Sequence, residues 1–318
     1  MAPLKLRLAL FAATLAPFAA TAQPAGAPAP LDRRLYMVAT AHLDTQWRWT
    51  IQDTISQYIP DTMRDNFALL ARYPGYVFSF EGAFRYQLMK EYYPEEYEQV
   101  KRYVRTGRWK VAGSWIDAVD THVPSPESLI RHALYGNGFF RRELGKTSRD
   151  VFLPDCFGFG YALPSVAAHS GLFAFSTQKL TWGSFIKPPF EVGLWEGIDG
   201  AALIASINPG DYVSVIRRDP ALDPTVYASQ DLQAQRSGLP IALRYFGTGD
   251  VGGAPTEGSV RVLQESLARK EATRVIPAAP STPSQSPMSK CRLTAAPQSS
   301  FCVEKPVSPQ CAATDGSA

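Results

Sequence analysis

A histidine and an aspartate two residues apart directly follow an apolar run that is typical of a β-strand. They are His42 and Asp44, in the run Val38–Trp49. In extended backbone, residues i and i+2 point to the same face, so both side chains can converge on one point. One nitrogen ligand and one oxygen ligand suit a zinc ion. The alternative is a surface histidine beside a turn aspartate, and this segment alone does not decide between them.

Two further aspartates occupy equivalent places in the pattern. Asp155 ends the apolar run 151–154, and Asp250 follows the run 241–246 through Gly-Thr-Gly. An aspartate at such a place can be the N-cap of the next helix. Both, however, lie among glycines, which allow a ligand to approach the backbone closely. Because functional crevices of α/β folds lie at the carboxyl ends of the strands, the combination favours a site.

Paired carboxylates beside a metal ion fit the hydrolysis of glycosides with retention of configuration. One carboxylate attacks the anomeric carbon and the other acts as acid and then as base. A zinc ion beside the nucleophile could orient sugar hydroxyls and stabilise developing charge. Some aromatic side chains could offer flat surfaces to sugar rings, with ordinary core packing as the alternative: Trp47, Trp49, Phe157 and Trp182. For Trp115 and Trp195 we expect core packing.

Short apolar runs alternate with longer amphipathic ones, which predicts an α/β fold with a parallel sheet covered on both faces, open or closed into a barrel. Strands are expected at 35–40, 76–80, 109–114, 151–154, 172–176, 202–207 and 241–246. Helices are expected at 57–72, 83–105, 126–143, 161–169 and 256–270. The stretch 188–200 is typical of a hairpin that ends in a two-residue Asp-Gly turn.

The first residues predict export. Residues 1–22 have a basic start, an apolar stretch and a small-residue cleavage site, which together are typical of a signal peptide. Residues 23–34 are expected to form a flexible leader. The apolar stretch is too short for a convincing membrane span, so we expect a periplasmic or secreted protein with no membrane attachment after signal removal. The net charge of +3 implies no nucleic-acid partner. The sequence is silent on the oligomeric state.

The composition changes abruptly near the end of the chain. Residues 278–318 contain one aromatic residue, Phe301, and no hydrophobic periodicity. Enrichment in Pro, Ser, Ala and Thr predicts a disordered tail. Either a reading-frame shift near residue 280 or a natural disordered tail would explain the change.

Several motifs occur in the order seen in glycoside hydrolase family 38. They are His42–Trp47, Gly113–Asp120, Pro124–Arg131, Asp155–Gly158, Trp195–Gly200 and Gly247–Asp250. Over residues 35–277 the chain therefore resembles the N-terminal catalytic domain of this family, which contains zinc-dependent, retaining α-mannosidases. The joint order of the motifs is much more specific than any one of them.

The resemblance implies a role for each matching residue. His42, Asp44 and Asp155 would bind Zn²⁺, and Asp155 would also be the nucleophile. Asp250 would be the general acid and base, and Trp47 would border the sugar-binding subsite. The implied fold is a seven-stranded β/α barrel-like domain, and the implied substrate is a mannose-containing glycan.

Two departures from the family pattern bear on activity. The family's fourth zinc ligand is a histidine downstream of the catalytic acid, whereas the histidines of this chain lie at 42, 122, 132 and 169. Family members also continue for several hundred residues through a helical segment and β-rich domains. We therefore expect an incomplete α-mannosidase with weak or no activity. The alternatives are a non-catalytic remnant that binds carbohydrate and a zinc-dependent deacetylase.

Overall fold

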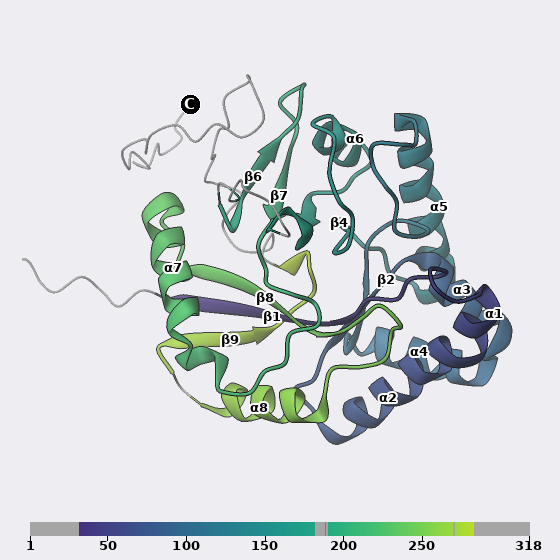
Figure 1. Ribbon diagram of the computed structural model, residues 1–318, viewed down its shortest axis with the longest axis horizontal. Coiled ribbons are helices and arrows are strands. Elements are labelled where there is room, and N and C mark those ends of the chain that lie inside the picture. Colours follow the sequence, from purple (N-terminus) through teal and green to yellow (C-terminus); the bar gives the residue numbers. More distant parts are fainter. Residues whose placement is uncertain (1–31, 182–187, 189, 270, 283–318) are drawn as a thin grey trace, which may run out of the picture. The chain divides into compact units, whose positions relative to one another are not determined.

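The computed structural model describes residues 32–181, 188, 190–269 and 271–282 (Figure 1). The predicted signal peptide, most of the predicted leader, and residues 283–318 of the predicted tail lie outside these described residues. The strands within them are β1 Arg33–Ala41, β2 Phe78–Glu81, β3 Trp109–Ala112, β4 Asp150–Phe152, β5 Ala174–Ser176, β6 Val192–Glu196, β7 Ala202–Ser206, β8 Ile241–Thr248 and β9 Thr273–Pro277.

Helices connect most of these strands. The α-helices are α1 Ile51–Asp53, α2 Ile59–Arg72, α3 Ala83–Tyr92, α4 Pro94–Arg105, α5 Pro126–Leu144, α6 Leu163–His169, α7 Pro224–Ser237 and α8 Glu257–Ala268. A π-helical stretch, Thr54–Tyr58, joins α1 to α2, and short 3-10 turns lie at Lys179–Thr181 and Pro220–Leu222. None of the described helices combines the length and the apolar character that crossing a membrane requires.

The strands form two sheets, so the expected seven-stranded barrel is not what the described residues show. The first sheet has the order β3-β2-β1-β8, with β9 also paired to β1, and every pairing in it is parallel. The second has the order β4-β5-β7-β6, in which β6 runs antiparallel to β7. Together the described residues hold nine strands rather than seven.

The two sheets approach each other without closing. On one side, the Ser114 N–H donates to the Asp150 carbonyl at 3.0 Å. On the other side, the segment after β7 lies against β8, where the Tyr245 N–H donates to Pro209 at 2.9 Å and the Gly247 N–H to Ser214 at 3.1 Å. These irregular segments make isolated hydrogen bonds where a barrel would need continuous ladders.

The side chains of β1 alternate between two hydrophobic clusters. Leu35, Met37 and Ala39 belong to the cluster that the first sheet shares with helices α2, α3, α4 and α8. Tyr36 and Val38 belong to a second cluster, which includes Phe152 of β4 and Tyr245 of β8 and so lies between the sheets. Because the period of a strand is two, the residues that continue the inward series after Val38 are Thr40 and His42.

The sequence-based element limits need several corrections. The helix expected over 83–105 is two helices, because Pro94 begins α4 and Tyr93 before it leaves the helical conformation. The expected hairpin over 188–200 is formed by β6 and β7, but its turn spans 197–201 and closes through the Gly197 N–H and the Ala201 carbonyl at 2.7 Å. Strand β1 begins at Arg33, within the predicted leader.

Among the elements of five or more residues, helix α7 and strand β9 were not predicted. Helix α7 buries Val226, Ser229, Gln230 and Gln233, so its inner face is mostly polar and gives no hydrophobic periodicity. Strand β9 is five residues long and follows α8 closely. Beyond it, Ala278 is buried and its N–H donates to the Met37 carbonyl at 2.9 Å, so the ordered chain continues into the first residue assigned to the tail.

Asp150 joins the two sheets and carries a buried carboxyl group. It begins β4, and its Oδ1 accepts the Gly113 N–H at 3.0 Å and the Ser148 hydroxyl. Burial raises the pKa of this carboxyl to about 6, although the hydrogen bonds from Ser148 and Gly113 act in the opposite direction. The folded protein therefore binds this proton more tightly than the unfolded chain, whose carboxyl has the ordinary pKa of 3.8.

We predict that Asp150 makes the protein less stable as the pH rises. Its favourable contribution is complete below about pH 4 and is lost as the pH rises through about 6. Asp150→Asn should remove this loss, so that from pH 4 to pH 7 wild type loses about 1–3 kcal/mol more free energy of unfolding than the variant. Urea unfolding in the presence of a chelator measures the difference. Asp61→Asn, on the exposed side of α2, is the control, and parallel pH profiles for wild type and Asp150→Asn would contradict the prediction.

Candidate metal centre and active site

The segment that follows β1 is held in extended form by the segment that follows β8. The His42 N–H donates to the Thr248 carbonyl at 2.9 Å, and the Asp44 N–H donates to the Asp250 carbonyl at 2.8 Å. Between them, Leu43 forms an isolated antiparallel bridge with Val251. The extended backbone places His42 and Asp44 on the same side, as their spacing predicted.

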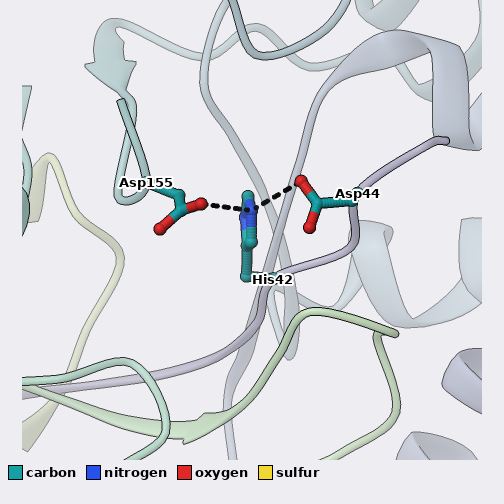
Figure 2. Close-up of side chains that lie close together, drawn as sticks. All are labelled: His42, Asp44 and Asp155. Atoms are coloured by element: carbon teal, nitrogen blue, oxygen red, sulfur yellow. Dashed lines mark ion pairs between the residues drawn. The ribbon is translucent and has the colours of Figure 1, made fainter. Parts of the chain in front are cut away.

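Asp155 meets these two side chains from the second sheet. It lies three residues beyond the end of β4, after Leu153, whose N–H donates to Ser176 at 3.1 Å. His42 Nε2 lies 3.4 Å from Asp44 Oδ1 and 3.8 Å from Asp155 Oδ2. Figure 2 shows the two carboxylates on opposite sides of the imidazole. One potential ligand atom from each residue lies within 4.8 Å of the others, so the three form a candidate metal site.

The environment of His42 fits a metal ion. The side chain is 2% exposed, and Nε2 has no hydrogen-bond partner among the described residues. Ligand atoms of a tetrahedral ion with bonds of about 2.1 Å lie roughly 3.4 Å apart, which is close to the 3.4 Å and 3.8 Å that separate Nε2 from the two carboxylates. Without a metal, burial lowers the pKa of His42, but the charge of Glu81 and the nearby Asp44 outweigh burial and raise it to about 10. A metal ion at Nε2 would therefore compete with a proton.

Asp250 is connected to Asp155 through a tyrosine hydroxyl. Tyr212 donates to Asp250 Oδ1 at 2.7 Å, and the same hydroxyl lies 3.3 Å from Asp155 Oδ1. Since both contacts end on one atom, the two carboxylate oxygens are at most about 6 Å apart. Burial, followed by the hydrogen bond to Asp250, raises the pKa of Tyr212, so the phenol keeps its proton.

Gly249 makes this arrangement possible. A Cβ at position 249 would lie 2.3 Å from a ring atom of Tyr212 and 3.1 Å from the Cβ of His42. Only glycine therefore lets the chain before Asp250 pass between the tyrosine and the histidine.

Asp155 also has a buried cationic partner. The ammonium group of Lys179 forms an ion pair with Asp155 Oδ1, and the lysine side chain is 4% exposed. The same ammonium lies 4.8 Å from the ring centre of Phe157. The two oxygens of Asp155 thus face different surroundings: Oδ2 faces His42, whereas Oδ1 faces Lys179 and Tyr212.

The aromatic side chains separate into exposed and packed groups. Trp47 is 55% exposed, with the Arg48 guanidinium 4.2 Å from its ring centre. Phe157 is 77% exposed, and Trp182 lies outside the described residues. Trp115 is buried and Trp195 packs beside Phe175, so these two belong to the core as expected.

The remaining histidines do not join the group of three. His122 lies on an exposed loop beside Asp120, His132 packs against Trp115, and His169 contacts Asp199 at 2.6 Å. Within the part of the chain that the structure describes, the candidate metal group consists of His42, Asp44 and Asp155.

Comparison with known proteins identifies the family. Residues 32–285 match the model of the glycosyl hydrolases family 38 N-terminal domain. The chain belongs to this family. It is 35% identical over 224 residues to α-mannosidase G of Dictyostelium discoideum and 31% identical over 232 residues to the α-mannosidase of Saccharomyces cerevisiae. These alignments cover 70% and 72% of the chain but only 20% and 21% of the relatives, so the chain spans about one fifth of their length.

Solved structures agree on the fold. An α-mannosidase from Enterococcus faecalis superposes with a TM-score of 0.61 at 18% identity, over 78% of this chain and 28% of that one. A polysaccharide deacetylase from Mycobacterium smegmatis superposes with a TM-score of 0.52 at 12% identity, over 87% of this chain and 98% of that one. At such identities the likeness shows a shared fold only.

Sequence reasoning missed Tyr212 and Lys179 in this family 38 domain. Lys179 follows β5 and Tyr212 follows β7, so both lie beyond the carboxyl ends of parallel strands, as the three aspartates do. The rule that selected the aspartates would have selected these residues too, had it been extended from carboxylates to lysine and tyrosine.

We predict that the metal site holds one divalent ion and depends on Asp44. Calorimetric titration of the metal-free protein with zinc as the probe should give one site per chain, and Asp44→Asn should weaken it at least tenfold because one charged ligand is lost. Asp120→Asn, an exposed carboxylate outside the group, is the matched control. Equal affinities for wild type and Asp44→Asn would remove Asp44 from the site.

Proposed function

We propose that this family 38 chain carries the nucleophile, the acid/base and a zinc centre of a retaining α-mannosidase that acts on mannose-containing glycans. The observation that carries the proposal is the pair of carboxylates, Asp155 and Asp250, on one tyrosine hydroxyl beside the candidate metal group. Family membership and the α-mannosidase names of the relatives support it.

The separation of the carboxylates favours retention of configuration. Retaining glycosidases hold their two carboxyl groups about 5–5.5 Å apart, whereas inverting enzymes need about 6.5–9.5 Å to admit a water. The upper limit of about 6 Å between Asp155 Oδ1 and Asp250 Oδ1 lies below the inverting range.

The residues that would hold zinc are His42, Asp44 and Asp155. The donor set of one buried imidazole and two carboxylates suits zinc among the common divalent ions. When bound, the ion would act as a Lewis acid that orients sugar hydroxyls and neutralises negative charge near the reacting centre.

The two carboxylates would share the chemistry of two steps. In the first, Asp155 forms a bond to the anomeric carbon while the glycosidic bond breaks, and protonated Asp250 gives its proton to the departing oxygen. In the second, Asp250 takes a proton from water, the water oxygen bonds to the anomeric carbon, and Asp155 leaves as a carboxylate. Two displacements at one carbon restore the original configuration.

Tyr212 and Lys179 would prepare the carboxylates for these roles. The hydroxyl of Tyr212 has one proton, which it donates to Asp250 while Asp250 is ionised. When Asp250 is protonated, the hydroxyl can accept from it and donate to Asp155 instead. Lys179 places a positive charge beside Oδ1 of the nucleophile Asp155. Trp47, with its exposed ring, would border the sugar.

The other functional candidates have less support. A zinc-dependent deacetylase would need a second histidine ligand, and the candidate metal group in the described residues has one. A purely carbohydrate-binding role would not require two carboxylates, Asp155 and Asp250, on one tyrosine hydroxyl, or a buried lysine beside one of them. For location, we propose a periplasmic or secreted protein that starts at Gln23, on the strength of the signal-like pattern in residues 1–22.

We predict that Asp155 becomes covalently attached to the sugar. A mannosyl fluoride slowed by a second fluorine on the ring should add one sugar mass to the chain, because the first step then outruns the second. Intact mass spectrometry followed by peptide mapping should place the label on Asp155. Asp155→Asn should lose both the label and the weak turnover of an aryl α-mannoside that is expected of the wild-type chain. Asp61→Asn is the control. A label on another residue, or undiminished turnover by Asp155→Asn, would refute the assignment.

We also predict that the Tyr212 hydroxyl is needed for rate more than for binding. Tyr212→Phe should lower kcat for an aryl α-mannoside about 10–100-fold with little change in KM, since it removes the hydroxyl that contacts both carboxylates. Tyr161→Phe, an exposed tyrosine that is 74% accessible, serves as the matched control. If Tyr212→Phe matches wild type in kcat, the hydroxyl has no role in catalysis.

A further inference from the structure

Glu81 contacts the histidine of the candidate metal group on the side away from the two aspartates. The residue ends β2, next to β1 in the first sheet, and its side chain is 3% exposed. Glu81 Oε1 lies 2.6 Å from His42 Nδ1, and both groups are buried. No sequence motif pointed to this residue.

We propose that Glu81 is a positioning residue that makes His42 a metal ligand through Nε2. A carboxylate 2.6 Å from Nδ1 accepts the Nδ1 proton and so selects the tautomer with its lone pair on Nε2. That nitrogen is the one that faces Asp44 Oδ1 and Asp155 Oδ2. The same bond fixes the rotation of the ring and increases the basicity of the ligating nitrogen. The inference rests on the proposed metal centre and adds the residue that orients it.

Arg85 places a buried positive charge near Glu81. Arg85 lies four residues after Glu81, in α3. Its side chain is 1% exposed, and its Nη2 lies 4.0 Å from Glu81 Oε1. A buried cation beside a buried carboxylate offsets part of the cost of removing that charge from water. The imidazole and the guanidinium therefore both approach the same oxygen of Glu81, Oε1.

Arg85 also holds the backbone between the two ligands from β1. Its Nε donates to the Leu43 carbonyl at 2.9 Å, its Nη2 contacts the same oxygen, and its Nη1 donates to Asp117 Oδ1 at 2.7 Å. Leu43 separates His42 from Asp44, so this bond constrains both ligands. The junction of β2 and α3 thus supports the imidazole through Glu81 and the backbone through Arg85.

Gly82 allows the junction to form. Its φ of +75° is a conformation that residues with a side chain rarely adopt, and a Cβ there would lie 2.3 Å from Arg85 Nη1. The glycine lets the chain turn from β2 into α3 while the arginine passes close to the backbone. Glu81, Gly82 and Arg85 act as one structural unit.

The first test observes the tautomer in the wild-type protein. The chain has four histidines, so ¹⁵N-histidine labelling gives a spectrum simple enough to assign. With one equivalent of zinc bound, His42 should show a protonated Nδ1 and a metal-bound Nε2. A spectrum with zinc on Nδ1, or with the proton on Nε2, would overturn the proposal.

The second test compares two variants of Glu81. Glu81→Ala should weaken zinc binding about 10–100-fold in chelator competition. Glu81→Gln should recover most of this loss, because its amide oxygen still accepts the Nδ1 proton. Glu91→Ala, an exposed glutamate on α3, is the control. Circular dichroism of the metal-free proteins checks folding, and if Glu81→Ala does not fold, the wild-type spectrum decides.

The outcomes separate this inference from the proposed function. Unchanged affinity in Glu81→Ala, or equal losses in both Glu81 variants, overturns the positioning role while leaving the zinc centre in place. A wild-type protein that binds no zinc overturns the positioning role and the proposed zinc centre together.

Discussion

The register between β1 and β8 is the constraint on which the site depends. The two strands pair in parallel along Arg34–Ala41 and Ile241–Thr248, and the segments that follow remain hydrogen-bonded as far as Asp44 and Asp250. Because the side chains of a strand alternate, a slip of one residue would turn His42 toward the helices and Leu43 toward the candidate metal group. The apolar side chains of β1 alternate, with Leu35 and Met37 in one hydrophobic cluster and Tyr36 and Val38 in another. A slip of one residue would disrupt both clusters, and this cost maintains the register.

Charge organises what the register brings together. Asp44, Asp155 and Asp250 approach one another in a partly buried place, where like charges repel strongly. Lys179 compensates Asp155, the Tyr212 hydroxyl connects Asp155 to Asp250, and the imidazole of His42 lies between Asp44 and Asp155. A divalent cation among these groups would complete the compensation.

The sequence predicted the site better than the fold around it. His42 and Asp44 were found from their spacing after an apolar run, and Asp155 and Asp250 from their positions after strands, and the structure brings all four into one region. Their chemical roles, and that of Trp47, stay predictions. Tyr212 and Lys179 were missed because neither has a characteristic spacing, and Glu81 because a buried glutamate at a strand end has no distinctive neighbours.

The architecture was harder to predict than the site, because neither sheet closure nor a helix with a polar buried face leaves a clear sequence pattern. Strand alternation indicates a parallel sheet, but it does not say whether the ends meet, and here Ser114 and the segment 209–214 make single hydrogen bonds where a barrel would have ladders. Hydrophobic periodicity did not predict helix α7, because glutamine and serine form most of its buried face. Tertiary hydrogen bonds, such as Gln233 Nε2 to the Val192 carbonyl at 2.8 Å, replace the apolar contacts that a pattern search detects.

The central claim is that His42, Asp44 and Asp155 bind one zinc ion. Anomalous diffraction at the zinc absorption edge, from crystals grown with zinc, tests it most directly. The account predicts one strong peak about 2.0–2.2 Å from His42 Nε2 and from one oxygen of each aspartate. A saturated crystal with no peak between these three side chains, or with zinc bound only elsewhere, would contradict it.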